Sequence, residues 1–251
     1  TIRNSFPRIR RPKAGKPGAS NEERSTLVDM TSVGIVGGSG YMGGEALRVL
    51  LRHPHAEIAW STSRTPGPVE QVHPNLYGSG LKFERLEDVQ TPDFVLLALP
   101  TAAPPKVAAR FLDAGARVID LGSAFRLKDR SLWERVYAQH HTAWALATEA
   151  IYGMPELHQE KIKTARLIAN PGCFSSAAIL GLAPLLQAGL VDPEHLVVDG
   201  LSGTAGAGAD LSRAIHHPEI GNNVVLYNVV GHRHTYEMEQ ELSALTGQSV
   251  R

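Results

Sequence analysis

Cysteine is almost absent from this sequence, because Cys173 is the only one among 251 residues. A single cysteine excludes an internal disulfide framework and any zinc site built from several cysteines. A reducing, cytoplasmic compartment is the simplest expectation for such a chain.

The chain also lacks an excess of either charge, because 25 Lys and Arg residues balance 25 Asp and Glu residues. This balance gives no reason to expect nucleic acid or a membrane surface as a partner. No apolar run approaches the ~20 residues that a transmembrane helix needs. The 43% hydrophobic content is enough for a sizeable core, in one large domain or two smaller ones.

Apolar residues are scarce in the first part of the chain, where Arg, Lys, Pro and Gly dominate. We therefore expect residues 1–31 to form a disordered basic arm. A transit peptide would be poor in acidic residues, whereas Glu22 and Glu23 occur here. We interpret the arm as sequence that precedes a natural start at Met30.

A glycine-rich loop follows the first apolar segment, Val33–Val36, and helix-forming residues 45–52 come next. Strand, glycine loop and helix form the context of a dinucleotide site, although the spacing is G-x-x-G-x-x-G rather than G-x-G-x-x-G. Glycine lets a pyrophosphate approach the backbone N–H groups at the helix start. The candidate cofactor-binding residues here are Gly37, Ser39, Gly40, Tyr41, Met42 and Gly43.

A second strand, predicted over residues 57–61, ends near Ser63 and Arg64. An NAD site usually has an acid at this end, to hold the ribose hydroxyls. Arg64 is instead suited to a 2′-phosphate, so we expect NADP. Glu57 has about the sequence offset of the NAD acid, but it stands at the start of the strand.

Further strands are predicted over residues 93–99 and 116–121, with a helix over 106–114 between them. This alternation predicts an α/β fold with a Rossmann-type, doubly wound parallel sheet. Loops at the carboxyl ends of such strands carry ligands, so Pro100 and Ser123 are candidates for the nicotinamide side. We expect this NADP-binding domain over residues 32–150 and a second, catalytic α/β (α+β) domain over residues 151–251.

The stretch around Cys173 combines a short apolar strand, Leu167–Ala169, with the turn Asn170-Pro171-Gly172 and a small apolar helical segment. The sulfur is therefore expected in the first turn of a helix. Free N–H groups and the positive end of the helix dipole favour a thiolate there. We interpret Cys173 as a nucleophile rather than as a small core residue.

Two more strands are expected in the second half, over residues 195–201 and 224–230. A run of small residues from Ser202 to Ala209 follows the first of them. His73 is expected to be a solvated loop histidine. His216 and His217 have no third ligand at a suitable spacing, so we predict no metal site.

The segment Gly231-His232-Arg233-His234-Thr235-Tyr236-Glu237 follows the last predicted strand. In an extended backbone His232 and His234 point to the same side. If Thr235 caps the next helix, Glu237 lies in the first turn, where it can orient an imidazole. Histidine suits proton transfer near neutrality, so we expect these histidines to serve Cys173.

The sequence resembles the N-acetyl-gamma-glutamyl-phosphate reductase family, within the aspartate-semialdehyde dehydrogenase superfamily. The matching motifs follow the family order: Gly37-Gly-Ser-Gly-Tyr-Met-Gly43, Thr62-Ser-Arg64, His73-Pro-Asn75, Phe125-Arg-Leu-Lys-Asp129, Tyr152-Gly-Met-Pro-Glu156, Asn170-Pro-Gly-Cys173, Ser202-Gly203 with Ala205-Gly-Ala-Gly208, and His232-Arg-His234 with Glu237.

The resemblance implies an NADPH-dependent reduction of an acyl phosphate through a thioester on Cys173, in arginine biosynthesis. It assigns proton transfer and substrate positioning to His234, His232 and Glu237, with His234 favoured as the acid/base. It further implies a homo-oligomer, a dimer or tetramer, and a C-terminally incomplete second domain. The implied substrate-binding residues are Arg126, Glu156, Asn170, Ser202, Gly203 and Arg233.

Some residues depart from the family pattern. Ala124 replaces an acidic residue, Thr101-Ala102 replaces His-Gly, and Phe174-Ser-Ser176 replaces Tyr-Pro-Thr. Two alternatives therefore stay open. One is the lysine-pathway relative that reduces a carrier-linked aminoadipyl or glutamyl phosphate, and the other is a non-catalytic NADP-binding sensor.

Overall fold

The computed structural model of the chain describes residues 30–251. Most of the basic arm expected over residues 1–31 therefore lies outside the described residues. Thr31, at its end, already belongs to the first strand, β1 (Thr31–Val36).

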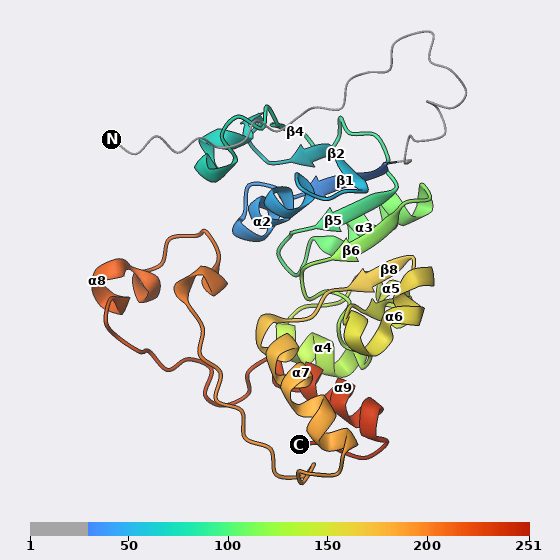
Figure 1. Cartoon of the computed structure of the whole chain (residues 1–251), viewed down its shortest axis with the longest axis vertical. Coiled ribbons are helices and arrows are strands. Elements are labelled where there is room, and N and C mark those ends of the chain that lie inside the picture. The colour runs from blue at the N-terminus through green and yellow to red at the C-terminus, as the bar shows by residue number, and fades with distance from the viewer. Residues whose placement is uncertain (1–29) are drawn as a thin grey trace.

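The described chain is built on one eight-stranded sheet with the order β3-β4-β2-β1-β5-β6-β8-β7 (Figure 1). All neighbouring strands are parallel except β3 and β4, which pair antiparallel. This confirms the predicted doubly wound α/β fold. The strands after β1 are β2 (Ala56–Thr62), β3 (Gly67–Pro68), β4 (Lys82–Glu84), β5 (Phe94–Leu97), β6 (Arg117–Asp120), β7 (Ile151–Tyr152) and β8 (Leu167–Ala169).

Each face of the sheet is covered, because successive side chains of a strand point to opposite faces. Ile35 packs in one apolar cluster with Leu47 of helix α2 (Tyr41–Leu50). Val36, the next residue, packs in another with Phe111 of α3 (Pro104–Asp113). Burying both faces explains why the predicted strands are almost continuously apolar.

The sheet continues past residue 150, because β8 pairs with β6 and β7 pairs with β8. The chain reaches these strands through α4 (Arg130–Tyr137) and α5 (Trp144–Glu149). Helix α6 (Pro155–Thr164) lies between β7 and β8. The strand that precedes Cys173 is thus part of the same sheet as β1.

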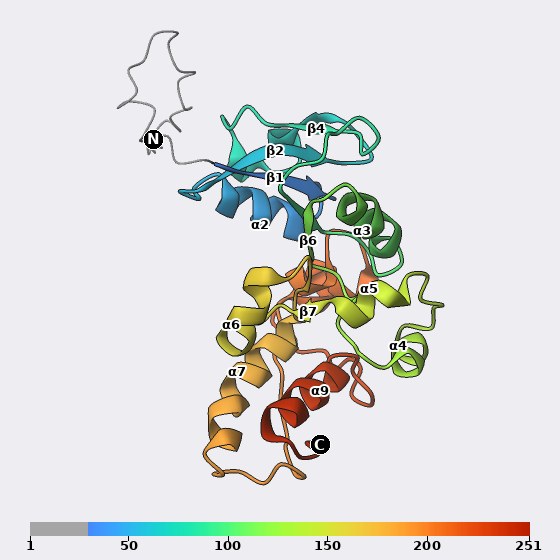
Figure 2. The same ribbon diagram turned by 90° about the vertical axis from the view of Figure 1, so that its right-hand side faces the viewer.

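Two helices pack together below the end of the sheet, as both views show (Figures 1 and 2). Helix α7 (Cys173–Gln187) contributes Ile179 and Leu186 to an apolar cluster, and α9 (Thr235–Thr246) contributes Leu242. Tyr152 of β7 belongs to the same cluster. The cluster joins the cysteine helix to the histidine helix, although they lie far apart in sequence.

The strands predicted over residues 195–201 and 224–230 are wrong: both segments are irregular. A strand needs a neighbour for its backbone hydrogen bonds, and neither segment pairs with any described strand. Most of their apolar side chains are instead exposed, with Leu201 at 88% and Val230 at 94%, whereas Leu196 is partly buried against the cluster of α7 and α9. Between them lie only η3 (Thr204–Ala207), η4 (Arg213–Ile215) and the single-turn α8 (His217–Ile220).

Candidate active site

The glycine loop after β1 has the geometry of a phosphate cradle. Gly37 has a φ of +84°, which favours glycine. A Cβ added at Gly43 would lie 2.4 Å from the Gly37 carbonyl oxygen, so the turn and the first turn of α2 touch. The N-cap of α2 is Gly40, without a side-chain cap, so the first N–H groups of the helix remain available to an anion.

His73 packs against this loop and is buried, which corrects the expectation of a solvated histidine. Its ring is buried, and Nε2 lies 2.8 Å from the carbonyl oxygen of Gly38. The ring also lies against Gly44, where an added Cβ would come within 2.3 Å of it. The segment around His73 carries two short 3-10 helices, η1 (Val69–Gln71) and η2 (Pro74–Leu76), which the Pro- and Gly-rich sequence did not predict.

The end of β2 presents hydroxyl groups and an exposed arginine. The Ser63 hydroxyl donates to Ser39 Oγ at 3.1 Å, which joins this end to the glycine loop. Arg64 is exposed beside it, and the described residues form no salt bridge with it. Glu57 pairs with Ser32 near the amino ends of β1 and β2, at the opposite end of these strands from the glycine loop.

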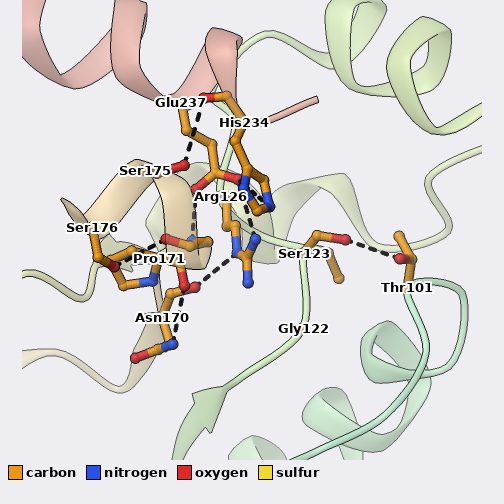
Figure 3. A network of polar contacts seen from close by, with 12 residues as sticks. Thr101, Gly122, Ser123, Arg126, Asn170, Pro171, Ser175, Ser176, His234 and Glu237 are labelled. Carbon is orange, nitrogen blue, oxygen red and sulfur yellow. Dashed lines mark hydrogen bonds and ion pairs between the residues drawn. The ribbon is translucent and has the colours of Figure 1, made fainter. Parts of the chain in front are cut away.

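The loops after β5 and β6 meet at the same edge of the sheet. Thr101 Oγ1 and Ser123 Oγ lie 2.9 Å apart (Figure 3). Pro100 is exposed in the first of these loops. Asp120 fixes the second, because its buried carboxylate accepts from the N–H groups of Gly122 and Ala124 at 3.0 and 3.2 Å. Burial raises the pKa of Asp120 to about 6.

Cys173 is the first residue of α7 and is exposed. The chain arrives from β8 through a fixed turn, in which Asn170 N–H donates to the Asp120 carbonyl oxygen at 2.9 Å. Gly172 is the N-cap, and its carbonyl accepts from Ser176 N–H at 2.8 Å. The sulfur thus stands at the amino end of a fifteen-residue helix, the end at which the helix dipole is positive.

His234 lies directly against the residue before the cysteine. A Cβ added at Gly172 would come within 2.5 Å of His234 Nε2, so only glycine leaves room for this ring. Burial lowers the pKa of His234 to about 4, although Glu237 opposes the shift. The imidazole is therefore neutral near pH 7 and is able to accept a proton.

His232 completes an aromatic group around the cysteine helix. Its ring centroid lies 4.8 Å from that of His234 and 5.3 Å from that of Phe174. His232 Nδ1 accepts the N–H of His234 at 3.1 Å, which leaves the proton of the neutral ring on Nε2. Burial and the neighbouring Arg233 lower the pKa of His232.

Glu237 is fully buried at the centre of a polar network (Figure 3). Arg126 Nη1 donates to its Oε1 at 3.1 Å. Tyr152 Oη and Gly172 N–H both donate to its Oε2, at 2.8 and 3.0 Å. His234 Nε2 lies farther off, 4.0 Å from Oε1. The helix N-cap is His234 rather than Thr235, and Glu237 still falls in the first turn.

The structure brings some predicted substrate-binding residues to this network and leaves others outside it. Arg126 is buried, and it also donates to the carbonyl oxygens of Asn170 and Leu121. The Asn170 amide donates to the carbonyl of Pro171. The remaining residues are exposed and form no hydrogen bond or salt bridge with Glu237: Glu156, Ser202, Gly203 and Arg233.

Residues 200–217 lie near two parts of the candidate site. A Cβ added at Gly200 would lie 2.6 Å from the ring of Phe174. Farther along, a cavity of about 760 Å³ separates Tyr41, the first residue of α2, from residues 204–217. This segment therefore faces both the cysteine helix and the glycine loop.

Sequence reasoning missed Tyr152 and Asp120. Tyr152 lies in the Tyr-Gly-Met-Pro-Glu motif, but Glu156 was the residue of that motif expected to bind substrate. Asp120 ends an apolar strand, and an acid at that position signals a loop fixed by backbone N–H groups.

Two kinds of feature are missing from residues 30–251. No group of three or more His, Cys, Asp or Glu side chains there is arranged to hold a metal ion. None of the helices described is long and apolar enough to cross a membrane.

Comparison with known proteins gives two family matches. Residues 32–165 match the semialdehyde dehydrogenase NAD binding domain, and residues 173–251 match the semialdehyde dehydrogenase dimerisation domain. An aspartate semialdehyde dehydrogenase from Francisella tularensis has a similar fold, with a TM-score of 0.53 at 13% identity, over 88% of this chain and 70% of that one.

Relatives in sequence carry two names. An N-acetyl-gamma-glutamyl-phosphate reductase of Desulforamulus reducens is 43% identical over 88% of this chain and 66% of its own length. Another, from Pseudomonas aeruginosa, is 46% identical over 88% of this chain and 66% of its own length. The LysW-L-2-aminoadipate 6-phosphate reductase of Deinococcus radiodurans is 44% identical over 84% and 62%. The chain thus spans about two thirds of the length of these relatives or slightly less. It belongs to the semialdehyde dehydrogenase family.

Proposed function

We propose that this chain carries the nucleophile and the cofactor site of an NADPH-dependent N-acetyl-gamma-glutamyl-phosphate reductase. The observation that supports this most is the position of Cys173. Its exposed thiol begins α7, and the neutral ring of His234 lies against the preceding residue. Relatives with this name match the chain at 42–46% identity.

The proposed reaction begins with the transfer of the thiol proton to His234. The Cys173 sulfur then forms a bond with the acyl carbon of N-acetyl-glutamyl 5-phosphate, and the bond from that carbon to the phosphate oxygen breaks. Phosphate leaves, and a thioester remains on Cys173. Bound NADPH supplies the hydride that reduces this carbon. The carbon–sulfur bond then breaks, and N-acetyl-glutamate 5-semialdehyde leaves as the cysteine regains its proton.

The glycine loop fits a dinucleotide, because the close contacts of Gly37 with Ala98 and of Gly43 with Gly37 hold the loop against the start of α2, whose N-cap has no side-chain hydrogen bond. The first N–H groups of the helix are therefore available to a pyrophosphate. Arg64 supports NADP over NAD, since its guanidinium is exposed at the end of β2. A 2′-phosphate there gains a charge-assisted, bidentate partner. The nicotinamide end would lie near Pro100 and Ser123, at the ends of β5 and β6.

A second candidate is the reduction of a carrier-linked aminoadipyl or glutamyl phosphate. The relative from Deinococcus radiodurans, at 44% identity, favours it. Both reactions use the same cysteine and cofactor, so the difference lies in how the rest of the acyl phosphate is bound.

Phosphate-dependent reduction of NADP by a panel of semialdehydes tests the proposal. Both this chain and a form extended to the length of its relatives would be assayed. We expect N-acetyl-glutamate semialdehyde to be the preferred substrate and Cys173→Ser to abolish turnover while NADPH binding stays within about threefold. Preference for aminoadipate semialdehyde on its carrier would support the second candidate. NADPH binding by the extended form without turnover of any substrate would support the sensor alternative.

A homo-oligomer is the proposed assembly. Residues 173–251 match the dimerisation domain of the family, and exposed apolar side chains gather there, at Val197, Leu201, Val224 and Val230. Cytoplasmic location stays a prediction.

A further inference from the structure

Tyr152 is a buried tyrosine whose hydroxyl group serves the site rather than the core. Its ring packs in the cluster that joins α7 to α9. Its hydroxyl points to Glu237 and donates to Oε2 at 2.8 Å. The same oxygen accepts Gly172 N–H, which belongs to the peptide just before Cys173.

Three donors therefore hold the Glu237 carboxylate in place from three different elements. Arg126 comes from the segment after β6, Tyr152 from β7, and Gly172 from the turn before α7. His234 Nε2, at 4.0 Å, is not one of these donors. The carboxylate is thus held at the cysteine turn and kept off the imidazole that should accept the thiol proton.

We propose that Tyr152 is a positioning residue, which acts through Glu237 to fix the turn before Cys173 and to limit the negative charge felt there. This inference rests on the nucleophilic role of Cys173 in the proposed function. It adds a buried residue whose hydroxyl acts on the Glu237 carboxylate rather than on the thiol itself.

The physical reason is that the negative charge of Glu237 is buried next to the turn before Cys173. A buried carboxylate depends on its donors for compensation, since water does not reach it. Without the tyrosine hydroxyl, Oε2 keeps only one donor, and more of its charge acts on the neighbouring thiol and imidazole. A nearby negative charge disfavours a thiolate and favours an imidazolium.

Several other charged or titratable groups face this corner and stay unchanged in the test. They are Arg126, His232 and Arg233 around His234, Glu241 on α9, and Tyr137 of α4. A change that follows removal of a single hydroxyl group therefore reports on Tyr152 and Glu237.

The test uses the fact that Cys173 is the only cysteine. The rate of its alkylation by iodoacetamide, measured from about pH 6 to about pH 10, follows the thiolate fraction. We expect Tyr152→Phe to move the midpoint of this profile upward by about half a pH unit or more, which slows alkylation about threefold at a fixed lower pH. Tyr236→Phe, a half-buried tyrosine next to Glu237 on α9, serves as the matched control and should leave the profile unchanged.

A cycle with Glu237→Gln decides whether the effect passes through the carboxylate. In that background Tyr152→Phe should no longer move the profile, because the charge is gone. An unchanged profile in Tyr152→Phe alone overturns the inference, and so does an equal shift in both backgrounds. Circular dichroism checks that each variant folds.

Alkylation requires neither an acyl phosphate nor NADPH. If the expected shifts occur while no semialdehyde is turned over, the proposed function fails and the role of Tyr152 at the thiol stands. If turnover occurs and the profiles coincide, the proposed function stands and the inference about Tyr152 fails.

Discussion

The sheet and residues 188–231 carry similar apolar patterns and have opposite fates. In and around the sheet, Ile35 of β1 and Phe111 of α3 are wholly buried, because helices cover both faces of the sheet. In residues 188–231, Leu211 is fully exposed and Val197 is 90% exposed. Figure 1 shows this segment, in orange, extending away from α7 and α9 on the side of α2. The same kind of sequence is structured in one place and irregular in the other.

The difference lies in hydrogen-bonding partners rather than in intrinsic preference. Strand β1 has a parallel neighbour on each side, β2 and β5. Residues 224–230 have none among the described strands. β-propensity describes how well a residue fits a half-buried pleated surface, so it has little effect where no such surface exists.

The largest expected effect follows from truncating one apolar side chain in each region. Phe111→Ala removes a buried ring from the cluster beneath α3, and we expect it to lower the free energy of unfolding by about 3–5 kcal/mol. Leu201→Ala should change it by less than about 0.5 kcal/mol, since the side chain is already in water. Urea unfolding followed by circular dichroism measures both. A similar loss for the two variants would mean that residues 188–231 are packed in solution.

The next prediction concerns Asp120, which lies inside the packed region. Its folded pKa of about 6 is above the ordinary value of 3.8, because burial penalises the charge. The protonated form is therefore favoured by folding, and this contribution to stability is present below about pH 4 and is lost as pH rises through 6.

Asp120→Asn removes this titration, and all other groups titrate equally in both proteins. We expect the stability of the wild type relative to the variant to fall by about 2 kcal/mol between pH 4.5 and pH 7.5. Urea unfolding at the two pH values gives the difference. Parallel pH curves would show that water reaches the carboxylate.

Much of the packed region could be predicted from sequence, and the reasons are local. Val33–Val36 followed by Gly37 predicts a strand and a tight turn, because apolar runs and glycine act over few residues. The same holds for Cys173, since Asn170-Pro171-Gly172 fixes where α7 begins. The predicted histidines also fall beside it, with His234 against Gly172.

The contacts that could not be predicted are those between distant segments. Glu237 bonds to Tyr152 across 85 positions and to Arg126 across 111. No periodicity encodes such pairs, because they depend on how α9 docks against the end of the sheet. His73 was misjudged for the same reason: its partner, the Gly38 carbonyl, lies 35 positions away.

The smallest expected effect compares two helical glycines, one at each end of the packed region. Gly43 lies in the first turn of α2, where an added Cβ would come within 2.4 Å of the Gly37 carbonyl oxygen and 2.6 Å of Gly38 Cα. Both are backbone atoms, so Gly43→Ala must push the glycine loop away from the helix start. We expect NADPH binding, measured by fluorescence titration, to weaken about tenfold, which is about 1.4 kcal/mol.

Gly181 lies within α7 with nothing within 4 Å of an added Cβ, so Gly181→Ala should leave NADPH binding unchanged and stabilise the helix by about 0.5–1 kcal/mol. Unaltered NADPH affinity in Gly43→Ala would mean that the loop does not hold the pyrophosphate. The two substitutions distinguish a glycine that cofactor binding requires from a glycine that only lowers the stability of its helix.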